Sequence, residues 1–283
     1  MSETIKIVTD SSSDLITLEG IDFDSAPLKI ATAKKEYVDD EHLDVRKMSD
    51  ELYEYHGKST TSCPNLHDWL RAFGDAEQIF CITITSGLSG SYNSACLAKA
   101  SYEKSHPGRR VCVIDSLSAG PEIALIAEKI REYVLEGLSF DEIEQRIAEY
   151  RTRTGLLFML ESLRNLANNG RVNPLVAKIA GILGIRMVGR ASDKGTLEPL
   201  DKCRGEKRAL EAIISRMREA GDRIVRVRIA HVFNHDLAKK LKALVLEAFP
   251  DTDVRYYPCR GLCSFYAEQG GLLIGFESKP LEE

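Results

Sequence analysis

Residues able to bind an anion gather where an apolar strand is expected to end and a helix to begin. In the stretch CITITSGLSGSYNSACLAKA, residues 81–100, β-branched residues come first and an alanine-rich run of helical character comes last. Between them lie the residues that we call the hydroxyl turn, residues 85–91: Thr85, Ser86, Gly87, Ser89, Gly90 and Ser91. A helix N-terminus presents unpaired N–H groups and a positive dipole end, and glycines let a ligand approach the backbone. The turn therefore suits a carboxylate or a phosphate, unless Ser89 or Ser91 only caps its own helix.

Motifs for phosphate loops and activated nucleophiles do not match this turn. A P-loop needs a lysine after its second glycine, a dinucleotide loop needs G-x-G-x-x-G, and GLSGS breaks the G-x-S-x-G pattern at its last position. An enzyme with Ser89 or Ser62 as nucleophile needs a base within reach, and no His–Asp partner is evident on the same edge. We therefore expect binding rather than catalysis. The alternative is a binder or enzyme for another small anion, such as a phosphate ester or a carboxylate.

A second polar cluster, STTSCPN at residues 59–65, precedes the predicted helix LHDWLRAFGDA. Its simplest role is to cap that helix. Cys63 lies near the same helix start, where a thiolate is favoured, so a redox-sensitive thiol is a further hypothesis. Asp10 and Asp115 end predicted strands but have no histidine partners, and the six histidines show no metal-ligand spacing. We expect neither a metal nor a cofactor.

The composition is that of an ordinary globular protein of 283 residues with a net charge of -5. An acidic chain argues against nucleic-acid binding, which usually needs a basic domain. The N-terminus MSETIKIVTD lacks the apolar segment of a secretory signal, and no apolar run approaches the ~20 residues of a membrane span. Seven scattered cysteines are typical of free thiols in a reducing compartment. We expect a cytoplasmic protein.

The elements that must position the polar residues alternate between strand and helix in the first half. Strands are predicted at IKIVTD, IFCITIT and RRVCVID, and a helix follows the last strand with Pro121 near its start and Gly137 as its C-cap. This alternation predicts a parallel, Rossmann-like α/β sheet. All three strands end in polar turns, and ligands bind outside the carboxyl ends of such strands.

The second half has an α+β pattern, and we place the domains at residues 1–152 and 153–283. Helices are predicted over residues 139–155, where Ser139 and Glu142 form a capping box, and over 156–172, 205–221 and 234–249. Strands are predicted at residues 195–203, 224–232 and 271–277. A basic run in this half would suit an acidic partner, or form a solvated face: Arg186, Arg190, Lys202, Arg204, Lys207 and Arg208.

In their order along nearly the whole chain, these stretches resemble the DegV family. The stretches that carry the resemblance are KIVTDSSSDL, APLKIATAKKEYVDD, TTSCPN, ITSGLSGSYNSA, VIDSLSAG, LESLRNLANNGRV and GTLEPLDKCRGEKRAL. The resemblance implies a two-domain α/β fold with a long-chain fatty acid in a tunnel between the domains. It implies a carrier with no catalytic site of its own, which presents the carboxyl group to a separate fatty acid kinase.

The resemblance also implies the residues that bind the carboxylate. The family ligands match Thr61 and Ser89, with Gly90 in the same turn, and the family arginine matches Arg171. We add the neighbouring Ser62. The apolar segments LLFML, IAGILGI and GGLLIGF are candidates for the tunnel wall or for plain core.

The sequence departs from the family where the carboxylate should bind. Tyr266 stands where the family has a histidine, and Glu268 and Gln269 follow where it has Gly-Pro. A tyrosine can donate a hydrogen bond but stays neutral near pH 7, whereas a histidine can carry charge. We hypothesise that Tyr266 donates to the acid in place of the histidine. The departures fit a paralogue that prefers a different acyl chain or does not use a kinase.

Overall fold

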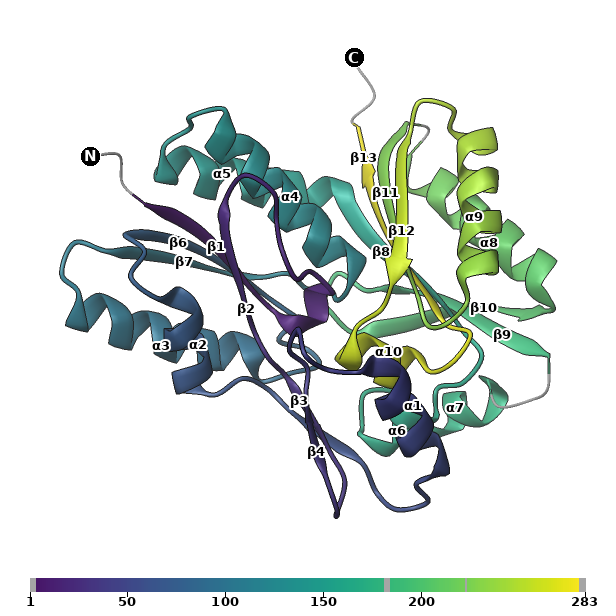
Figure 1. Ribbon diagram of the computed structural model, residues 1–283. Helices are drawn as coiled ribbons and strands as arrows, with labels where there is room; N and C mark the ends of the chain where they lie inside the picture. The colour runs from purple at the N-terminus through teal and green to yellow at the C-terminus, as the bar shows by residue number, and fades with distance from the viewer. Residues whose placement is uncertain (1–3, 181–183, 222, 280–283) are drawn as a thin grey trace.

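In the computed structural model, residues 4–180, 184–221 and 223–279 are described, and they form three sheets (Figure 1). A parallel four-stranded sheet has the order β2-β1-β6-β7 and a six-stranded sheet has the order β10-β9-β8-β13-β11-β12. A small antiparallel sheet has the order β4-β3-β5. The predicted fold class, a parallel α/β unit followed by an α+β unit, is confirmed.

The four-stranded sheet, with the helices on its two faces and the small sheet beside it, forms what we call the N-terminal unit. Its strands are β1 (Ile5–Asp10), β2 (Asp22–Ala26), β6 (Gln78–Thr83) and β7 (Arg110–Asp115). Its helices are α2 (Leu66–Phe73), α3 (Ser91–Ser105), α4 (Pro121–Leu135) and α5 (Phe140–Tyr150). The small sheet has β3 (Lys29–Ala31), β4 (Glu36–Val38) and β5 (Thr60–Ser62), and α1 (Val45–Glu54) lies between β4 and β5 in the chain.

The buried residues of the parallel strands alternate between the two faces, because successive side chains of a strand point to opposite sides. Along β6, Ile79 and Cys81 pack with α2 and α3, whereas Phe80 and Ile82 pack with α4 and α5. Both faces are thus covered by helices, which explains why the strands read as continuous apolar runs. The polar residues are left for the turns at the carboxyl ends of the strands.

The six-stranded sheet and the remaining helices form what we call the C-terminal unit. Its strands are β8 (Thr154–Leu160), β9 (Ile185–Ala191), β10 (Leu197–Arg204), β11 (Ile224–His231), β12 (Asp253–Pro258) and β13 (Leu272–Ser278). Its helices are α6 (Arg164–Asn168), α7 (Pro174–Ala180), α8 (Glu206–Glu219), α9 (His235–Ala248) and α10 (Gly261–Ala267). Helices α8 and α9 cover one face of the sheet (Figure 1), and the other face looks toward the N-terminal unit.

Strand β8 corrects the prediction of a helix over residues 156–172. Leu157 and Met159 pack under α8 and α9, while Leu156, Phe158 and Leu160 belong to the opposite face of the sheet. An apolar run buried on both sides has no strand-like alternation, so periodicity could not distinguish it from a buried helix. The helix predicted over residues 139–155 also ends earlier, at Tyr150, although its capping box forms as predicted.

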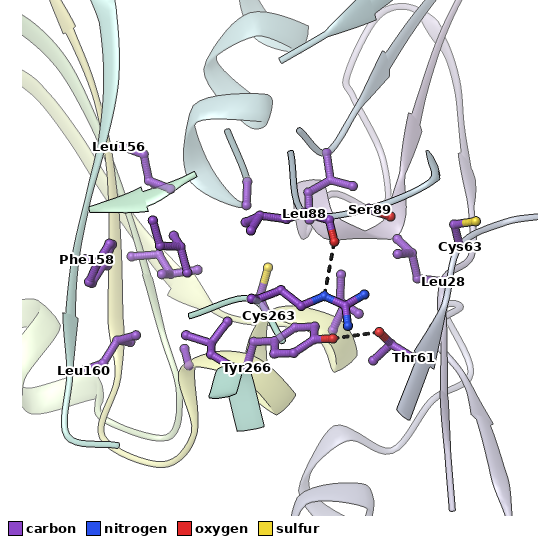
Figure 2. A pocket seen from close by; sticks show the side chains of 18 of the residues that line it. Leu28, Thr61, Cys63, Leu88, Ser89, Leu156, Phe158, Leu160, Cys263 and Tyr266 are labelled. Carbon is purple, nitrogen blue, oxygen red and sulfur yellow. Dashed lines mark hydrogen bonds between the residues drawn. The ribbon is translucent and has the colours of Figure 1, made fainter. Parts of the chain in front are cut away.

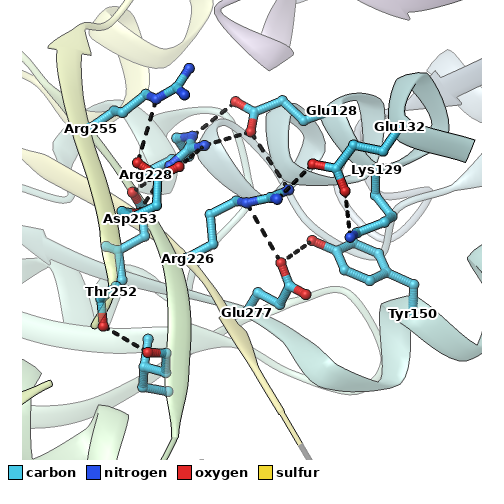
Figure 3. Close-up of polar contacts among 12 residues, drawn as sticks. Glu128, Lys129, Glu132, Tyr150, Arg226, Arg228, Thr252, Asp253, Arg255 and Glu277 are labelled. Atoms are coloured by element: carbon cyan, nitrogen blue, oxygen red, sulfur yellow. Dashed lines mark hydrogen bonds and ion pairs between the residues drawn. The ribbon is translucent and has the colours of Figure 1, made fainter. Parts of the chain in front are cut away.

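A cluster of ion pairs joins helix α4 of the N-terminal unit to the C-terminal sheet (Figure 3). Arg228 on β11 is only 2% exposed and lies 2.7 Å from Glu128 of α4 and 2.8 Å from Asp253 of β12. Arg226, on the same strand, lies 2.6 Å from Glu132 of α4. A buried guanidinium needs such partners, since an unpaired buried charge is costly. The two units therefore meet through paired charges as well as apolar contacts.

The described part of the chain contains no helix long and apolar enough to cross a membrane. Part of the predicted basic run is paired within the chain: Arg186 lies 2.8 Å from Glu161, and Arg190 lies 2.8 Å from Glu198. These two arginines therefore offer less free charge to an acidic partner than the sequence suggested.

Candidate functional site

A cavity of about 280 Å³ lies between the two units (Figure 2). The N-terminal unit contributes the turns after its strands, as expected for a parallel sheet, and the C-terminal unit contributes the inner face of its sheet and helix α10. All six predicted site residues line this cavity: Thr61, Ser62, Ser89, Gly90, Arg171 and Tyr266. Residues from both units and from widely separated parts of the chain are thereby brought together.

One end of the cavity is apolar. Leu156, Phe158 and Leu160 project from β8 and are almost fully buried, and Leu273 of β13 lies beside them. Phe158 lies against Gly189 of β9, where an added Cβ would come within 2.3 Å of the phenyl ring. The lack of a side chain at Gly189 thus makes room for the phenyl ring. The leucine and phenylalanine side chains together form a hydrocarbon wall.

The other end of the cavity is polar and reaches the surface, where Ser62 and Gly90 are exposed. Thr61 of β5 and Tyr266 of α10 lie there, with their hydroxyl oxygens 2.7 Å apart (Figure 2). Burial raises the pKa of Tyr266 from its usual value, so the phenol keeps its proton at neutral pH. Because only one hydroxyl of the pair donates to the other, one hydrogen is left to donate to a ligand.

Arg171 brings a positive charge to the polar end. Its Nε donates to the carbonyl oxygen of Leu88 in the hydroxyl turn, at 3.2 Å, and its Nη1 donates to the carbonyl oxygen of Asn169. The guanidinium carbon lies 5.9 Å from the centre of the Tyr266 ring. The arginine therefore joins the C-terminal unit to the hydroxyl turn and holds its charge beside the tyrosine.

Asp10, a fully buried aspartate at the end of β1, holds the hydroxyl turn in place through hydrogen bonds. Its Oδ2 accepts from the hydroxyl of Ser91 at 2.6 Å and from the N–H of Ile84 at 2.8 Å. Burial raises the pKa of Asp10, and its hydrogen bonds act in the opposite direction. Asp10 thus holds a turn, as strand-ending aspartates often do, and Ser91 is occupied by it.

Ser89 keeps its hydroxyl hydrogen available. Its oxygen accepts from the N–H of Ser91 at 3.2 Å, while the N-cap of α3 is Gly90, which makes no side-chain cap. Ser91 therefore does not cap its helix, because its hydroxyl donates to Asp10. Ser89 does accept from the first N–H of the helix, as the simpler interpretation expected, and its own O–H can donate elsewhere. This arrangement fits an anion at the helix start.

Cys63 lines the cavity beside these groups. Burial raises the pKa of its thiol, and the nearby Asp10 charge raises it further. A thiol with a raised pKa is less nucleophilic and less easily oxidised than the thiol of a solvent-exposed cysteine. The hypothesis of a thiolate at this helix start is therefore not supported.

The described lining of the cavity contains no carboxylate, and its one basic side chain is Arg171. Among the described residues that line it there is no histidine, and Asp115 accepts from the N–H groups of Ser86 and Leu117. His231 is buried at the end of β11, with its Nδ1 accepting from the N–H of Asn234. Within the described residues, no group of three or more His, Cys, Asp or Glu side chains could hold a metal.

Helix α10 was not predicted from the sequence, although it brings Leu262, Cys263 and Ala267 to the cavity in addition to Tyr266. Its seven residues are too few for a clear period, and its first N–H groups bind carboxylates distant in the sequence, so no local capping signal exists. The proposed wall segment IAGILGI lies partly outside the described residues.

Comparison with known proteins agrees with this architecture. The family model described as "Uncharacterised protein, DegV family" matches residues 4–279. A DegV domain-containing protein of Streptococcus pneumoniae is 44% identical over 278 residues, which cover 97% of this chain and 99% of the relative.

Two solved structures are similar over nearly their full length. A DegV family protein from Eubacterium eligens, loaded with heptadecanoic acid, has a TM-score of 0.96 and 44% identity, covering 98% of this chain and 100% of that one. The Streptococcus pneumoniae Fatty Acid Kinase (Fak) B3 protein, loaded with linoleic acid, has a TM-score of 0.95 and 43% identity, with the same coverage. Since the family model and these relatives match from end to end, the chain belongs to the DegV family.

Proposed function

We propose that the protein binds a long-chain fatty acid in the cavity between its two units. The acyl chain lies along β8 and β13, and the carboxylate lies at the polar end. The observation that carries the proposal is the division of one cavity into a hydrocarbon wall and a cluster of hydroxyls beside Arg171. The related proteins loaded with heptadecanoic and linoleic acid support it.

The carboxylate is held by donors from both units. Thr61 or Tyr266 supplies one hydroxyl hydrogen and Ser89 another, and the backbone at Ser62 and Gly90 is within the same end of the cavity. Arg171 supplies the positive charge. A carboxylate that left water without such partners would cost several kcal/mol or bind in its protonated form.

The acyl chain provides most of the affinity. Each buried methylene contributes about 0.8 kcal/mol, so a dozen methylenes contribute roughly 10 kcal/mol before ordering costs are subtracted. A cavity of about 280 Å³ lies near the lower end of the roughly 300–1,000 Å³ typical of small-molecule sites. A single unbranched chain is therefore a better occupant than a bulky lipid.

We further propose that the protein is a carrier and not an enzyme, and that it acts in the cytoplasm. The polar end of the cavity reaches the surface at Ser62 and Gly90, so a bound carboxylate is accessible to a separate fatty acid kinase that makes the acyl phosphate. The seven free cysteines suit a reducing compartment. The similarity to the Fak B3 protein supports the kinase as partner.

A ligand titration separates this function from the alternative of another small anion. Delipidated protein is titrated with palmitate, oleate, the matching fatty alcohol, and nucleotides with Mg²⁺, with thermal stability as the readout. We expect stabilisation by the acids, weaker stabilisation by the alcohol and none by nucleotides. Stabilisation by nucleotides alone would contradict the proposal. Adding a fatty acid kinase and ATP to the loaded protein then tests for acyl phosphate and ADP.

A further inference from the structure

Helix α10, which carries Tyr266, has its first turn bound by a carboxylate of the N-terminal unit. The N–H of Gly261 donates to Oδ1 of Asp39 and the N–H of Leu262 donates to Oδ2, each at 2.8 Å. The side chain of Asp39 is 0% exposed. A carboxylate that binds the first N–H groups of a helix stabilises both the free N–H groups and the helix dipole. Here the carboxylate and the helix belong to different units.

A second acidic side chain holds the residue before the helix. The N–H of Arg260 donates to Oδ1 of Asp14 at 2.7 Å, and the Arg260 side chain has its Nε 4.0 Å from Oδ1 of Asp39. The approach is close, since a Cβ on Gly261 would lie 2.6 Å from Oδ1 of Asp39. Asp14 and Asp39 therefore fix the start of α10 against the N-terminal unit.

The other end of this short helix carries the phenol that meets Thr61. Thr61 lies on β5, which pairs with β3, and Asp39 follows β4 on the other side of β3. Asp39, one residue after β4, and Thr61 of β5 thus lie at the same small sheet and contact opposite ends of α10. A shift of the first turn of the helix would move Tyr266 relative to Thr61.

We propose that Asp39, assisted by Asp14, is a positioning residue that acts through α10 to hold Tyr266 against Thr61. The inference rests on the proposed function, because the affected property is recognition of a carboxylate. Neither aspartate lines the cavity, so neither contacts the ligand. Their contribution is the placement of a hydroxyl that does.

The test is the variant Asp39→Asn, alone and combined with Tyr266→Phe. Asparagine offers one acceptor oxygen, and its amide N–H₂ faces the second helix N–H. We expect about tenfold weaker binding of palmitate, comparable to the loss of one hydrogen bond to a charged group, and less than about twofold loss for hexadecanol. In the Tyr266→Phe background the further loss from Asp39→Asn should fall below about twofold.

A matched control is Asp44→Asn, since Asp44 caps α1 through the N–H of Lys47 and asparagine is an equally good cap. It should leave palmitate binding unchanged. The same palmitate loss from Asp39→Asn in both backgrounds, or an equal loss for hexadecanol, would overturn the proposal. If Asp39→Asn does not fold, Gly261→Ala tests the same contact, because its methyl group pushes α10 away from Asp39.

A ligand-free measurement keeps the two proposals distinguishable. With 3-fluorotyrosine incorporated, the ¹⁹F signal of residue 266 should shift in Asp39→Asn toward its position in Thr61→Val, in which the hydrogen bond is absent. An unchanged signal would refute the positioning role even if fatty acid binds. If Asp39→Asn shifts the signal but the wild type binds no fatty acid, the carrier function is refuted while the role of Asp39 in placing Tyr266 is supported.

Discussion

At the scale of single residues, the polar end of the cavity carries Tyr266, where the family resemblance led us to expect a histidine. Tyr266 keeps its proton because burial raises its pKa. It therefore offers a hydroxyl and no charge, and Arg171 is left as the positive group among the described residues that line the cavity. This difference leads to two predictions on carboxylate binding.

The first prediction concerns the pH dependence of binding. The wild type should bind palmitate with nearly constant affinity between pH 6 and 8, while Tyr266→His should bind more tightly as pH falls through the histidine pKa, ordinarily about 6.5. The protonated imidazole attracts the carboxylate and the neutral form does not. Titrations at four pH values measure this, with hexadecanol as the uncharged control. A flat profile for Tyr266→His would contradict the proposed contact.

The second prediction concerns Arg171. Arg171→Gln should weaken palmitate binding by about tenfold or more, because a charged hydrogen-bond donor is lost from a partly buried site. Hexadecanol binding should change little, and Arg171→Lys should recover part of the loss by restoring the charge. Isothermal titration of the three proteins checks this. Equal losses for acid and alcohol would show that Arg171 supports the fold rather than the carboxylate.

At the scale of elements, local patterns predicted the parts of the site whose signals lie close together in the sequence. The strands that end in polar turns placed Ser89 and Gly90 correctly at the carboxyl edge of the sheet. Strand β8 was mistaken for a helix because both its faces are buried. Helix α10 was missed because its capping groups, Asp14 and Asp39, precede it by more than two hundred residues. Contacts between residues far apart in the sequence determine these two elements, and no short stretch of the sequence contains both partners.

The third prediction is that the stability of the protein depends on pH through Asp14, which binds the N–H of the residue before α10. Burial, mainly, and the neighbouring Asp39 raise the pKa of Asp14 to about 7, while the Arg260 N–H and charge and the Cys263 thiol lower it. The folded protein therefore holds a proton that the unfolded chain releases near pH 4. Stability from this group is present at low pH and is lost as pH rises through about 7.

The variant Asp14→Asn isolates this contribution, because its amide oxygen can still accept from Arg260. We expect the free energy of unfolding to fall less between pH 5 and 7.5 in Asp14→Asn than in the wild type, as measured in urea. The remaining slope reports other buried acids such as Asp10 and Glu122, whose pKa values burial also raises. Identical slopes in the two proteins would contradict the shifted pKa of Asp14.

At the scale of the whole molecule, the cavity exists because two units meet face to face. The sequence predicted both units, and we propose that the boundary lies at residues 152 and 153, between α5 and β8. It did not predict the ion pairs between α4 and β11, since surface and buried charges are alike in a sequence. The family resemblance, rather than local pattern, suggested Arg171, which lies between α6 and α7, and Tyr266, which lies on α10.

The fourth prediction follows from these ion pairs. Glu128→Ala should destabilise the protein by about 3 kcal/mol or more, because it leaves the buried guanidinium of Arg228 with a single carboxylate partner. Denaturation in urea measures the loss. Lys207→Ala, which removes an exposed i,i+4 pair with Glu211, is the control and should change stability by less than about 1 kcal/mol. Equal effects would show that the buried network contributes no more than a surface pair.

Binding of a long-chain fatty acid in the cavity is best tested on the purified protein before any delipidation. The native mass gives the stoichiometry, and solvent extraction of the denatured protein identifies what was bound. We predict one equivalent of a single-chain fatty acid per protein chain, and no fatty acid in protein that is denatured before purification. If the protein carries no fatty acid and gains no thermal stability from any added fatty acid, the cavity does not bind this class of ligand.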